Sequence, residues 1–403
     1  MIHTWKKYKL SEIGSVVGGA TPSTTVDAYY NGDIPWLTPK DLSNFHERYI
    51  ERGERNITKS GLNSCSAQLL PAGSVLFSSR APIGYVAIAK NPIATNQGFK
   101  SIIPNPEKVD SLFLYYLLKY NKDNIEAMGS GTTFKEVSGA TMKNIEVYLP
   151  EDLEEQRRIA GILGSLDNKI ELNRRINANL EAQAQALFRS WFVDFEPFRD
   201  GPFVDSELGK IPQGWKVAEL GDVTKQQTEK VGPQKTVKVL SPITTGELVL
   251  SEEYFTKQVF SESITKYIIV KPNQFAYNPA RINIGSIGRN TFEFDGCVSP
   301  VYVVFECEKG YHYFFDFFRK TDAFKQEVIS RAIGGVRQTL GYKDFALIKV
   351  IYPPQNVVLE FNTIYTNLLN LQNHNNIEVK NLSALRDTLL PKLMAGEINI
   401  ENQ

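Results

Sequence analysis

Apolar residues recur every three or four positions across residues 150–192. Acidic residues crowd the first turn of this stretch and Pro150 stands just before them, which favours a helix start. Alternate steps of four and three residues trace a heptad seam, the pattern of a coiled coil. The seam positions are Ile159, Leu163, Leu166, Ile170, Asn173, Asn177, Leu180, Ala184, Leu187 and Trp191. A helix of this length spans roughly 60 Å, and it would expose its seam if it had no partner.

A second stretch, residues 354–395, repeats the pattern half a chain later. Its seam positions are Phe361, Tyr365, Leu368, Gln372, Asn375, Val379, Leu382, Arg386, Leu389 and Leu393. Both seams are polar midway, at Asn173 and Asn177 and at Gln372 and Asn375. Antiparallel packing brings the two middles together, and buried amides fix register at a cost in stability. We therefore predict an intramolecular antiparallel coiled coil. Two simpler alternatives are that both stretches are ordinary amphipathic core helices, and that the amides are solvent-exposed breaks in a weak seam.

The segments that precede the two helices also correspond in order. The first series has expected strands at 70–77, 78–88, 96–103 and 145–150, with a short helix at 112–119 and a glycine-rich loop at 129–135. The second has related segments at 271–277, 281–287, 298–305, 348–353, 313–318 and 332–339. Arg80 and Gly84 correspond in spacing to Arg281 and Gly285. We predict an α/β (α+β) fold with two tandem-duplicated globular lobes and the two long helices.

Charge and cysteine usage narrow the class of protein. The 403 residues hold 45 basic and 45 acidic side chains, so the formal net charge is zero. The lobes are slightly basic and the helices slightly acidic, which permits two nucleic-acid-binding lobes without requiring them. Cys65, Cys297 and Cys307 are isolated, and the four histidines are scattered. We expect a cytoplasmic chain with reduced thiols and no metal site.

Signals for membranes and catalysis are missing from the sequence. No run of about 18 apolar residues occurs, and no apolar segment follows Met1, so neither a membrane span nor a secretory signal is expected. No GxxxxGK[ST] loop is found, which argues against ATP binding. Residues 352–355 share only two prolines with the catalytic loop of amino-methyltransferases. Asp295 with Glu306 and Glu308 is a weak match to a metal-nuclease site. We expect no catalytic residue and no cofactor bound by this chain.

Four local motifs stand out along the chain. They are Glu155-Gln156-Arg157-Arg158-Ile159-Ala160, Ala186-Leu187-Phe188-Arg189-Ser190-Trp191-Phe192, Asp205-Ser206-Glu207-Leu208-Gly209-Lys210-Ile211-Pro212 and Leu389-Leu390-Pro391-Lys392-Leu393-Met394-Ala395-Gly396. Together they resemble one known family, the specificity subunits of type I restriction-modification enzymes. The resemblance covers essentially the whole chain. In the second helix only Gln355 matches the first of these motifs, so partner docking is expected to be less symmetric than the duplication.

This resemblance implies a division of labour along the chain. Residues 1–150 and 200–352 would be target recognition domains, each reading one half of a bipartite site in double-stranded DNA. Residues 151–199 and 353–403 would be helical spacers that dock two modification subunits, which bind S-adenosylmethionine and methylate adenine. Up to two restriction subunits, which use ATP and Mg²⁺, would complete the complex. This chain would be a non-catalytic subunit that binds no cofactor.

Candidate DNA contacts are polar side chains in or near the loops beside the expected strands, able to reach bases or phosphates. They are Lys40, Arg80, Asn96, Gln97, Thr133, Lys135, Arg281, Asn283, Arg289, Arg337, Gln338 and Lys343. Some occupy repeated positions, so a structural role inside the lobes is the competing interpretation. Two other functions also remain open. The chain could serve a type II restriction-modification system with two half-sites, or it could be a duplicated protein-binding scaffold without a DNA role.

Overall fold

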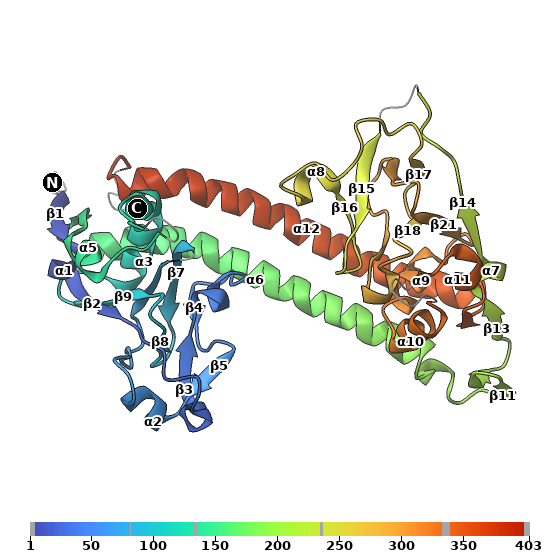
Figure 1. Ribbon diagram of the computed structural model, residues 1–403, viewed down its shortest axis with the longest axis horizontal. Helices are drawn as coiled ribbons and strands as arrows, with labels where there is room; N and C mark the ends of the chain where they lie inside the picture. The colour runs from blue at the N-terminus through green and yellow to red at the C-terminus, as the bar shows by residue number, and fades with distance from the viewer. Residues whose placement is uncertain (1–4, 81, 132–134, 234–236, 333–338, 399–403) are drawn as a thin grey trace. The chain divides into compact units, whose positions relative to one another are not determined.

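The computed structural model describes residues 5–80, 82–131, 135–233, 237–332 and 339–398. Two long helices stand out, α6 (Leu153–Phe192, green) and α12 (Gln355–Met394, red) (Figure 1). Contacts group the chain into a first unit, Met1–Asn177 with Asn373–Gln403, and a second unit, Ala178–Gln372. Each unit therefore combines one globular lobe with part of both long helices.

The described strands of the first lobe form three sheets. The first pairs β1 (Trp5–Lys9) antiparallel with β10 (Glu146–Pro150). The largest has the order β2-β9-β6-β7-β4, from β2 (Gly14–Gly18), β9 (Lys100–Pro104), β6 (Val75–Ser79), β7 (Ile83–Ala89) and β4 (Tyr49–Ile50). The third has the order β5-β3-β8, from β5 (Arg55–Ile57), β3 (Tyr30–Leu37) and β8 (Ala94–Thr95). The helices are α1 (Leu10–Ile13), η1 (Asp27–Tyr29), η2 (Pro39–Leu42), α2 (Lys59–Asn63), α3 (Ser111–Tyr120), α4 (Lys122–Ala127) and α5 (Gly139–Asn144).

The second lobe begins after a connector that holds η3 (Glu196–Phe198) and a hairpin of β11 (Phe203–Ser206) with β12 (Gly209–Pro212). β13 (Lys216–Glu219) pairs antiparallel with β22 (Lys349–Tyr352). One sheet has the order β14-β21-β18-β19, from β14 (Thr224–Gln227), β21 (Val303–Cys307), β18 (Phe275–Tyr277) and β19 (Ile287–Arg289). Another has the order β16-β15-β20-β17, from β16 (Leu248–Leu250), β15 (Lys238–Pro242), β20 (Gly296–Val298) and β17 (Ile268–Val270). The helices are α7 (Leu220–Val223), α8 (Ser251–Tyr254), η4 (Ile282–Ile284), α9 (His312–Phe318), α10 (Asp322–Arg331) and α11 (Tyr342–Phe345).

The described strands of the two lobes follow the same plan of pairing. The order β2-β9-β6-β7 corresponds to β14-β21-β18-β19, and the parallel pair β3 and β8 corresponds to β15 and β20. In each lobe the opening strand pairs with the strand that leads into a long helix. Gly84 and Gly285 have φ angles of 97° and 93°, a left-handed conformation that glycine adopts without strain.

The long helices pack against each other with opposite chain direction in the first unit. Arg386 Nη1 of α12 lies 2.7 Å from Asp167 Oδ1 of α6. Further along α6, Asn173 donates to Glu378 at 2.7 Å. Residue numbers therefore increase along α6 in the direction in which they decrease along α12, so the two helices are antiparallel here. The twenty expected seam positions are all buried or partly buried. The periodicity therefore identified the faces that the helices turn inward.

Polar contacts attach the first lobe to α6. Arg48 is buried at 4% exposure, and its Nε lies 3.0 Å from Glu171 Oε1. Its Nη1 also donates to the carbonyl oxygen of Gly164 at 3.2 Å. A Cβ atom added to Gly164 would lie only 3.2 Å from this nitrogen, so glycine leaves room for the guanidinium group. Gln156 is fully buried and bonds to the backbone of Lys108 and Asp110. The glycine in α6 thus accommodates the arginine, and α6 remains one continuous helix.

Aromatic packing dominates the second unit. Phe188 and Phe192 of α6 contact Phe361 of α12, with ring centroids 6.0 and 5.1 Å apart. Phe317 of α9 stacks on Phe188 at 5.2 Å and meets Tyr365 at 4.9 Å. Such pairs add about 0.5–1.5 kcal/mol each beyond the area they bury. The second lobe is held to the helices chiefly by apolar burial.

A buried ion cluster lies at the edge of this aromatic core. Arg289 Nε and Arg319 Nη2 reach the Asp316 carboxylate at 3.1 and 2.5 Å, and all three side chains are buried. Burial by itself would raise the pKa of Asp316, but the two guanidinium groups hold it below its ordinary value. At the start of α9, burial and the nearby Arg289 lower the pKa of His312 to about 4.

Three expected strands are interrupted in the structure. The expected strand 78–88 is divided between the end of β6 and β7, and the other two contain turns. The segment 96–103 contains a turn between β8 and β9, and 298–305 contains a turn between β20 and β21. The turns are closed by hydrogen bonds from Phe99 N to Asn96 O at 3.2 Å and from Tyr302 N to Ser299 O at 2.9 Å. Gly98 and Pro300 occupy them, and both residue types favour turns over strand interiors. The sequence prediction of unbroken strands was wrong at all three places.

Replacing Arg48 with methionine should destabilise the first unit by about 3–5 kcal/mol, because it leaves the Glu171 carboxylate buried without its cation. Chemical denaturation followed by circular dichroism measures this change. The matched control is Lys40→Met, which removes an ion pair whose Lys40 side chain is 80% exposed. That control should cost less than about 1 kcal/mol, and equal losses in the two variants would contradict the role of Arg48.

Stability of the second unit should fall as the pH drops from about 6.5 to about 4. Over this range His312 takes up a proton in the unfolded chain but stays neutral in the folded one, so its contribution is complete above pH 6.5 and lost toward pH 4. The expected loss is about 2 kcal/mol after allowance for partial exposure. Thermal unfolding at a series of pH values tests this. The His312→Phe variant should show a flatter pH profile, and an unchanged slope would refute the assignment.

Candidate nucleic-acid interface

Three segments of the first lobe meet around the turn at residues 96–99, which we call the first turn. Thr21 donates a side-chain hydrogen bond to Gln97 Oε1. Ser79 N, at the end of β6, donates to the Gly98 carbonyl at 2.7 Å. A Cβ added to Gly98 would lie 2.7 Å from Pro39 Cγ, which places η2 and its Lys40 alongside. The fold therefore brings together the candidates Lys40, Arg80, Asn96 and Gln97.

The charges around the first turn leave cations available. Arg80 and Lys100 share Glu136, at 3.9 and 3.3 Å. Lys135, the residue before Glu136, is exposed. Two cations beside one carboxylate give this edge a local positive charge that suits phosphate contact.

Side chains at the first turn differ in what they offer to a ligand. Asn96 Oδ1 accepts from Gly98 N at 2.9 Å and so shapes the turn itself. Gln97 is exposed at the turn, where its amide has both donors and an acceptor for base edges. We therefore interpret Asn96 as structural and Gln97 as the better base-contact candidate.

The second lobe has a corresponding surface around residues 299–302, which we call the second turn. Arg281 is exposed before η4, and Asn283 in η4 is partly exposed. Tyr302 lies beside Arg281 and Asn278. Burial raises the pKa of Tyr302, while the charge of Arg281 and a side-chain hydrogen bond with Asn278 oppose that rise. Lys343 is exposed on α11, the helix whose Phe345 stacks on Tyr277 at 5.3 Å.

Arg289 stands apart from the other candidates in its placement. It is 8% exposed, bonded to Asp316 and to Asn273 at 2.6 Å, and lies 4.9 Å from the Tyr313 ring. These contacts favour a structural role over DNA contact. Thr133, Arg337 and Gln338 lie outside the described residues.

The predicted register residues of the helix pair also have defined positions. Asn375 donates to Asn177 Oδ1 at 2.9 Å, and Asn177 donates to Asn376 Oδ1 at 2.7 Å. Asn173 is 1% exposed and pairs with Glu378. Gln372 is partly buried on α12. Asn173, Asn177 and Asn375 thus make contacts between α6 and α12 in the first unit, whereas Gln372 belongs to the second unit.

The structure adds residues that the sequence analysis did not single out. Thr21, Lys100 and Glu136 join the first turn, and Val301 and Tyr302 belong to the second. Val301 is 71% exposed, which is unusual for a large apolar side chain. Ser299-Pro300 was the signal available in the sequence, because this pair favours a turn inside what resembled a strand.

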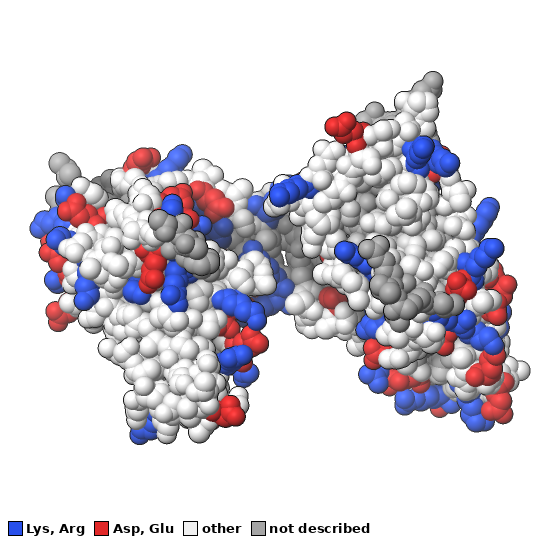
Figure 2. Space-filling view, viewed as in Figure 1, with Lys and Arg blue, Asp and Glu red and all other residues white. Residues whose placement is uncertain are grey.

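Charge is mixed across the surface. On the face drawn in Figure 2, basic side chains of each unit are interspersed with acidic ones. Within the described ranges, no group of three or more His, Cys, Asp or Glu side chains could hold a metal ion. Burial raises the pKa of Cys297 to about 12, so this thiol stays protonated at neutral pH. No helix in the described part of the chain has the length and apolar character for a membrane crossing.

Comparisons with known proteins agree on one family. A family model for the type I restriction modification DNA specificity domain matches residues 2–182. The chain is 36% identical to the specificity subunit of the type I restriction enzyme MjaIX from Methanocaldococcus jannaschii, over 98% of this chain and 94% of that protein. It is 25% identical to the HindI specificity subunit from Haemophilus influenzae, over 98% and 99% of the two chains.

A solved structure shares the fold. The type I restriction-modification S subunit from M. genitalium aligns with a TM-score of 0.57 at 17% identity, over 97% of this chain and 96% of that one. The alignment with the MjaIX specificity subunit from M. jannaschii covers both lobes and both long helices of this chain. This chain therefore belongs to the family of type I restriction enzyme specificity subunits.

Proposed function

We propose that this chain supplies the DNA address of a type I restriction-modification complex, with each lobe reading one half of a bipartite site. The observation that carries the proposal is the pair of equivalent turns, residues 96–99 and 299–302, each beside an arginine, Arg80 or Arg281. Two lobes with the same strand order suit a duplex, whose own two-fold symmetry presents two half-sites. A tandem duplication accounts for this shared order.

The long helices would act as the spacer between the half-sites. Each unit contains one lobe, the first part of the helix that follows it and the last part of the other helix. An antiparallel coiled coil with a pseudo-two-fold axis accounts for this exchange. Under this proposal register is functional, because sliding by one heptad shifts one lobe by about 10 Å, or roughly three base pairs.

The proposed domains follow from this division. Residues 1–150 and 200–352 would be recognition domains, and residues 151–199 and 353–403 would be spacers that dock two modification subunits. Those subunits would bind S-adenosylmethionine and methylate adenine, and up to two restriction subunits would use ATP and Mg²⁺. The chain alone would bind no cofactor and catalyse no step. DNA methylation assays with and without the modification subunit test this, and methyl transfer by the chain alone would refute it.

The division into lobes predicts the outcome of a domain exchange. Replacing residues 1–150 with the lobe of another family member should change one half-site and leave the other unchanged, because the second turn is untouched. Methylation of a randomised DNA library, read by sequencing, measures both half-sites. A change in both would contradict independent reading by the lobes.

Base and phosphate contacts should respond differently to substitution at the first turn. Gln97→Ala should relax preference at one base position by about 1–3 kcal/mol, whereas Lys40→Ala should weaken all sequences alike and reduce the salt slope by about 1. The control is Thr21→Val, which removes the hydrogen bond to Gln97 but keeps its amide. Gel-shift titrations with the modification subunit present measure these effects. If Gln97→Ala acts like Lys40→Ala, Gln97 does not read a base.

The amides of Asn177 and Asn375 should fix the register of the helix pair while lowering its stability. Replacing both with leucine should raise the thermal stability of the helix pair, since apolar side chains replace partly buried amides, while loosening the spacer length that the complex accepts. The matched control is Asn179→Leu, at an exposed position of α6. Methylation of sites with altered spacers provides the measurement. A double variant that keeps strict spacer selectivity would show that these amides do not set register.

A further inference from the structure

At one of the positions where the two long helices differ, α6 carries a carboxylate and α12 does not. Both are 40 residues long, and they begin at Leu153 and Gln355, so a residue of α6 corresponds to the one 202 positions later in α12. On α6, Asp167 accepts a hydrogen bond from Tyr116 of the first lobe at 2.6 Å. The corresponding residue of α12 is Leu369. The second helix therefore offers its lobe no carboxylate at this position.

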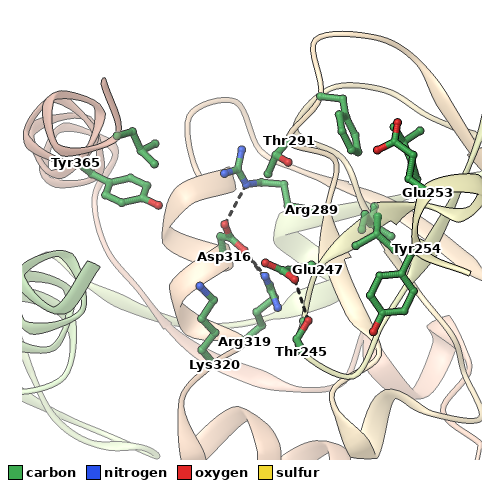
Figure 3. Close-up of a pocket in the computed structure, with 16 residues that line it drawn as sticks. Thr245, Glu247, Glu253, Tyr254, Arg289, Thr291, Asp316, Arg319, Lys320 and Tyr365 are labelled. Carbon is green, nitrogen blue, oxygen red and sulfur yellow. Dashed lines mark hydrogen bonds and ion pairs between the residues drawn. The ribbon is translucent and has the colours of Figure 1, made fainter. Parts of the chain in front are cut away.

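A cavity lies beside Leu369 in the second unit. It encloses about 550 Å³ and is bounded by Tyr365 and Leu369 of α12, the end of α9, β16 and β19. Figure 3 shows Tyr365 directing its hydroxyl toward Asp316, on the same side as Arg289 and Arg319. Thr291 lines it as well, and Lys320 completes the wall.

The wall of this cavity carries excess positive charge. Arg289 and Arg319 share the single carboxylate of Asp316, so the buried cluster has a net charge of +1. In the part of the chain that the structure describes, no second carboxylate lies within ion-pair distance of either guanidinium. Lys320 adds another cation, and its Nζ is 3.9 Å from Glu181. A buried charge without a full counterion is costly, so a bound anionic group would stabilise this wall.

The exposed part of the same lining has the opposite charge. Glu247 and Glu253 both line the cavity and are exposed, and Glu247 accepts a hydrogen bond from Thr245 at 2.9 Å. Two possible ligands differ in how strongly these exposed carboxylates repel them. A DNA backbone, which is a polyanion, is repelled more strongly than a protein segment whose acidic side chain is flanked by basic ones. The charges thus favour a protein segment with an acidic residue next to a basic one.

We propose that this cavity receives an acidic side chain of the modification subunit, which supplies the carboxylate that α12 lacks at Leu369. The inference rests on the proposed function and adds an anchoring site in the second unit. The partner's carboxylate bonds to Arg289 and Arg319, and a neighbouring basic residue of the partner pairs with Glu247 and Glu253. The first unit has no need of such a group, because Asp167 and Glu171 of α6 already face Tyr116 and Arg48.

The test is a substitution in this chain that introduces a carboxylate into the cavity. Leu369→Asp should occupy the cationic wall and weaken binding of the modification subunit by about tenfold, the scale of one charge-assisted hydrogen bond. The control Leu369→Asn has the same size without the charge and should stay within about twofold of the unmodified chain. Isothermal titration calorimetry of the full-length chain with the purified modification subunit measures both. Equal affinities for the two variants would overturn the proposal.

A second variant keeps the test independent of folding at position 369. Lys320→Gln removes one cation of the wall, and Lys325→Gln is the matched control, an exposed lysine on α10 paired with Asp322. Only Lys320→Gln should weaken assembly, by about threefold or more, and the difference should shrink at high salt. If Lys320→Gln lowers DNA affinity but not assembly, the cavity takes a phosphate and the proposal is wrong. If the unmodified chain binds neither the subunit nor DNA, the proposed function itself fails.

Discussion

The buried carboxylate of Asp167 joins three parts of the first unit. Its two oxygens accept hydrogen bonds from Tyr116 of the lobe at 2.6 Å and from Arg386 of α12 at 2.7 Å, and the residue is only 4% exposed. A buried charge that loses its partners costs several kcal/mol, so this contact tolerates no slip between the elements. Burial and the same carboxylate raise the pKa of Tyr116, which keeps its hydroxyl a donor. The lobe and both helices are therefore held in one register by directional bonds.

The second unit reaches a related architecture with different forces. Its helix segments meet through Phe188, Phe192 and Phe361, and its buried charges lie within the lobe, at Asp316 and its two arginines. Apolar packing depends on volume more than on direction, so it tolerates sequence divergence that a hydrogen-bonded carboxylate does not. This difference explains how the two lobes keep the same strand order while their attachments to the helices differ.

Near-neutral charge is compatible with a role in DNA recognition. Phosphate contacts supply affinity that is independent of sequence, while base edges and DNA shape supply selectivity. Exposed side chains on the equivalent turns, Gln97 in the first lobe and Val301 in the second, are of the types that read base edges and thymine methyl groups. A family member that works inside a larger complex needs little non-specific affinity of its own.

The sequence by itself determined the long helices, their inward faces and the order of the main segments. These features depend on local periodicity, which each stretch carries alone. It also identified the family through short motifs. Only the tertiary structure decided which distant residues meet. Arg48 pairs with Glu171, which is 123 positions away, and Arg289 is buried against Asp316. The sequence carries a turn signal at Ser299-Pro300, but the surrounding apolar run still resembled an unbroken strand, because short apolar runs look alike until their partners are known. Contacts between residues far apart in the chain leave no periodic trace, so the grouping of polar side chains around the two turns follows from packing alone.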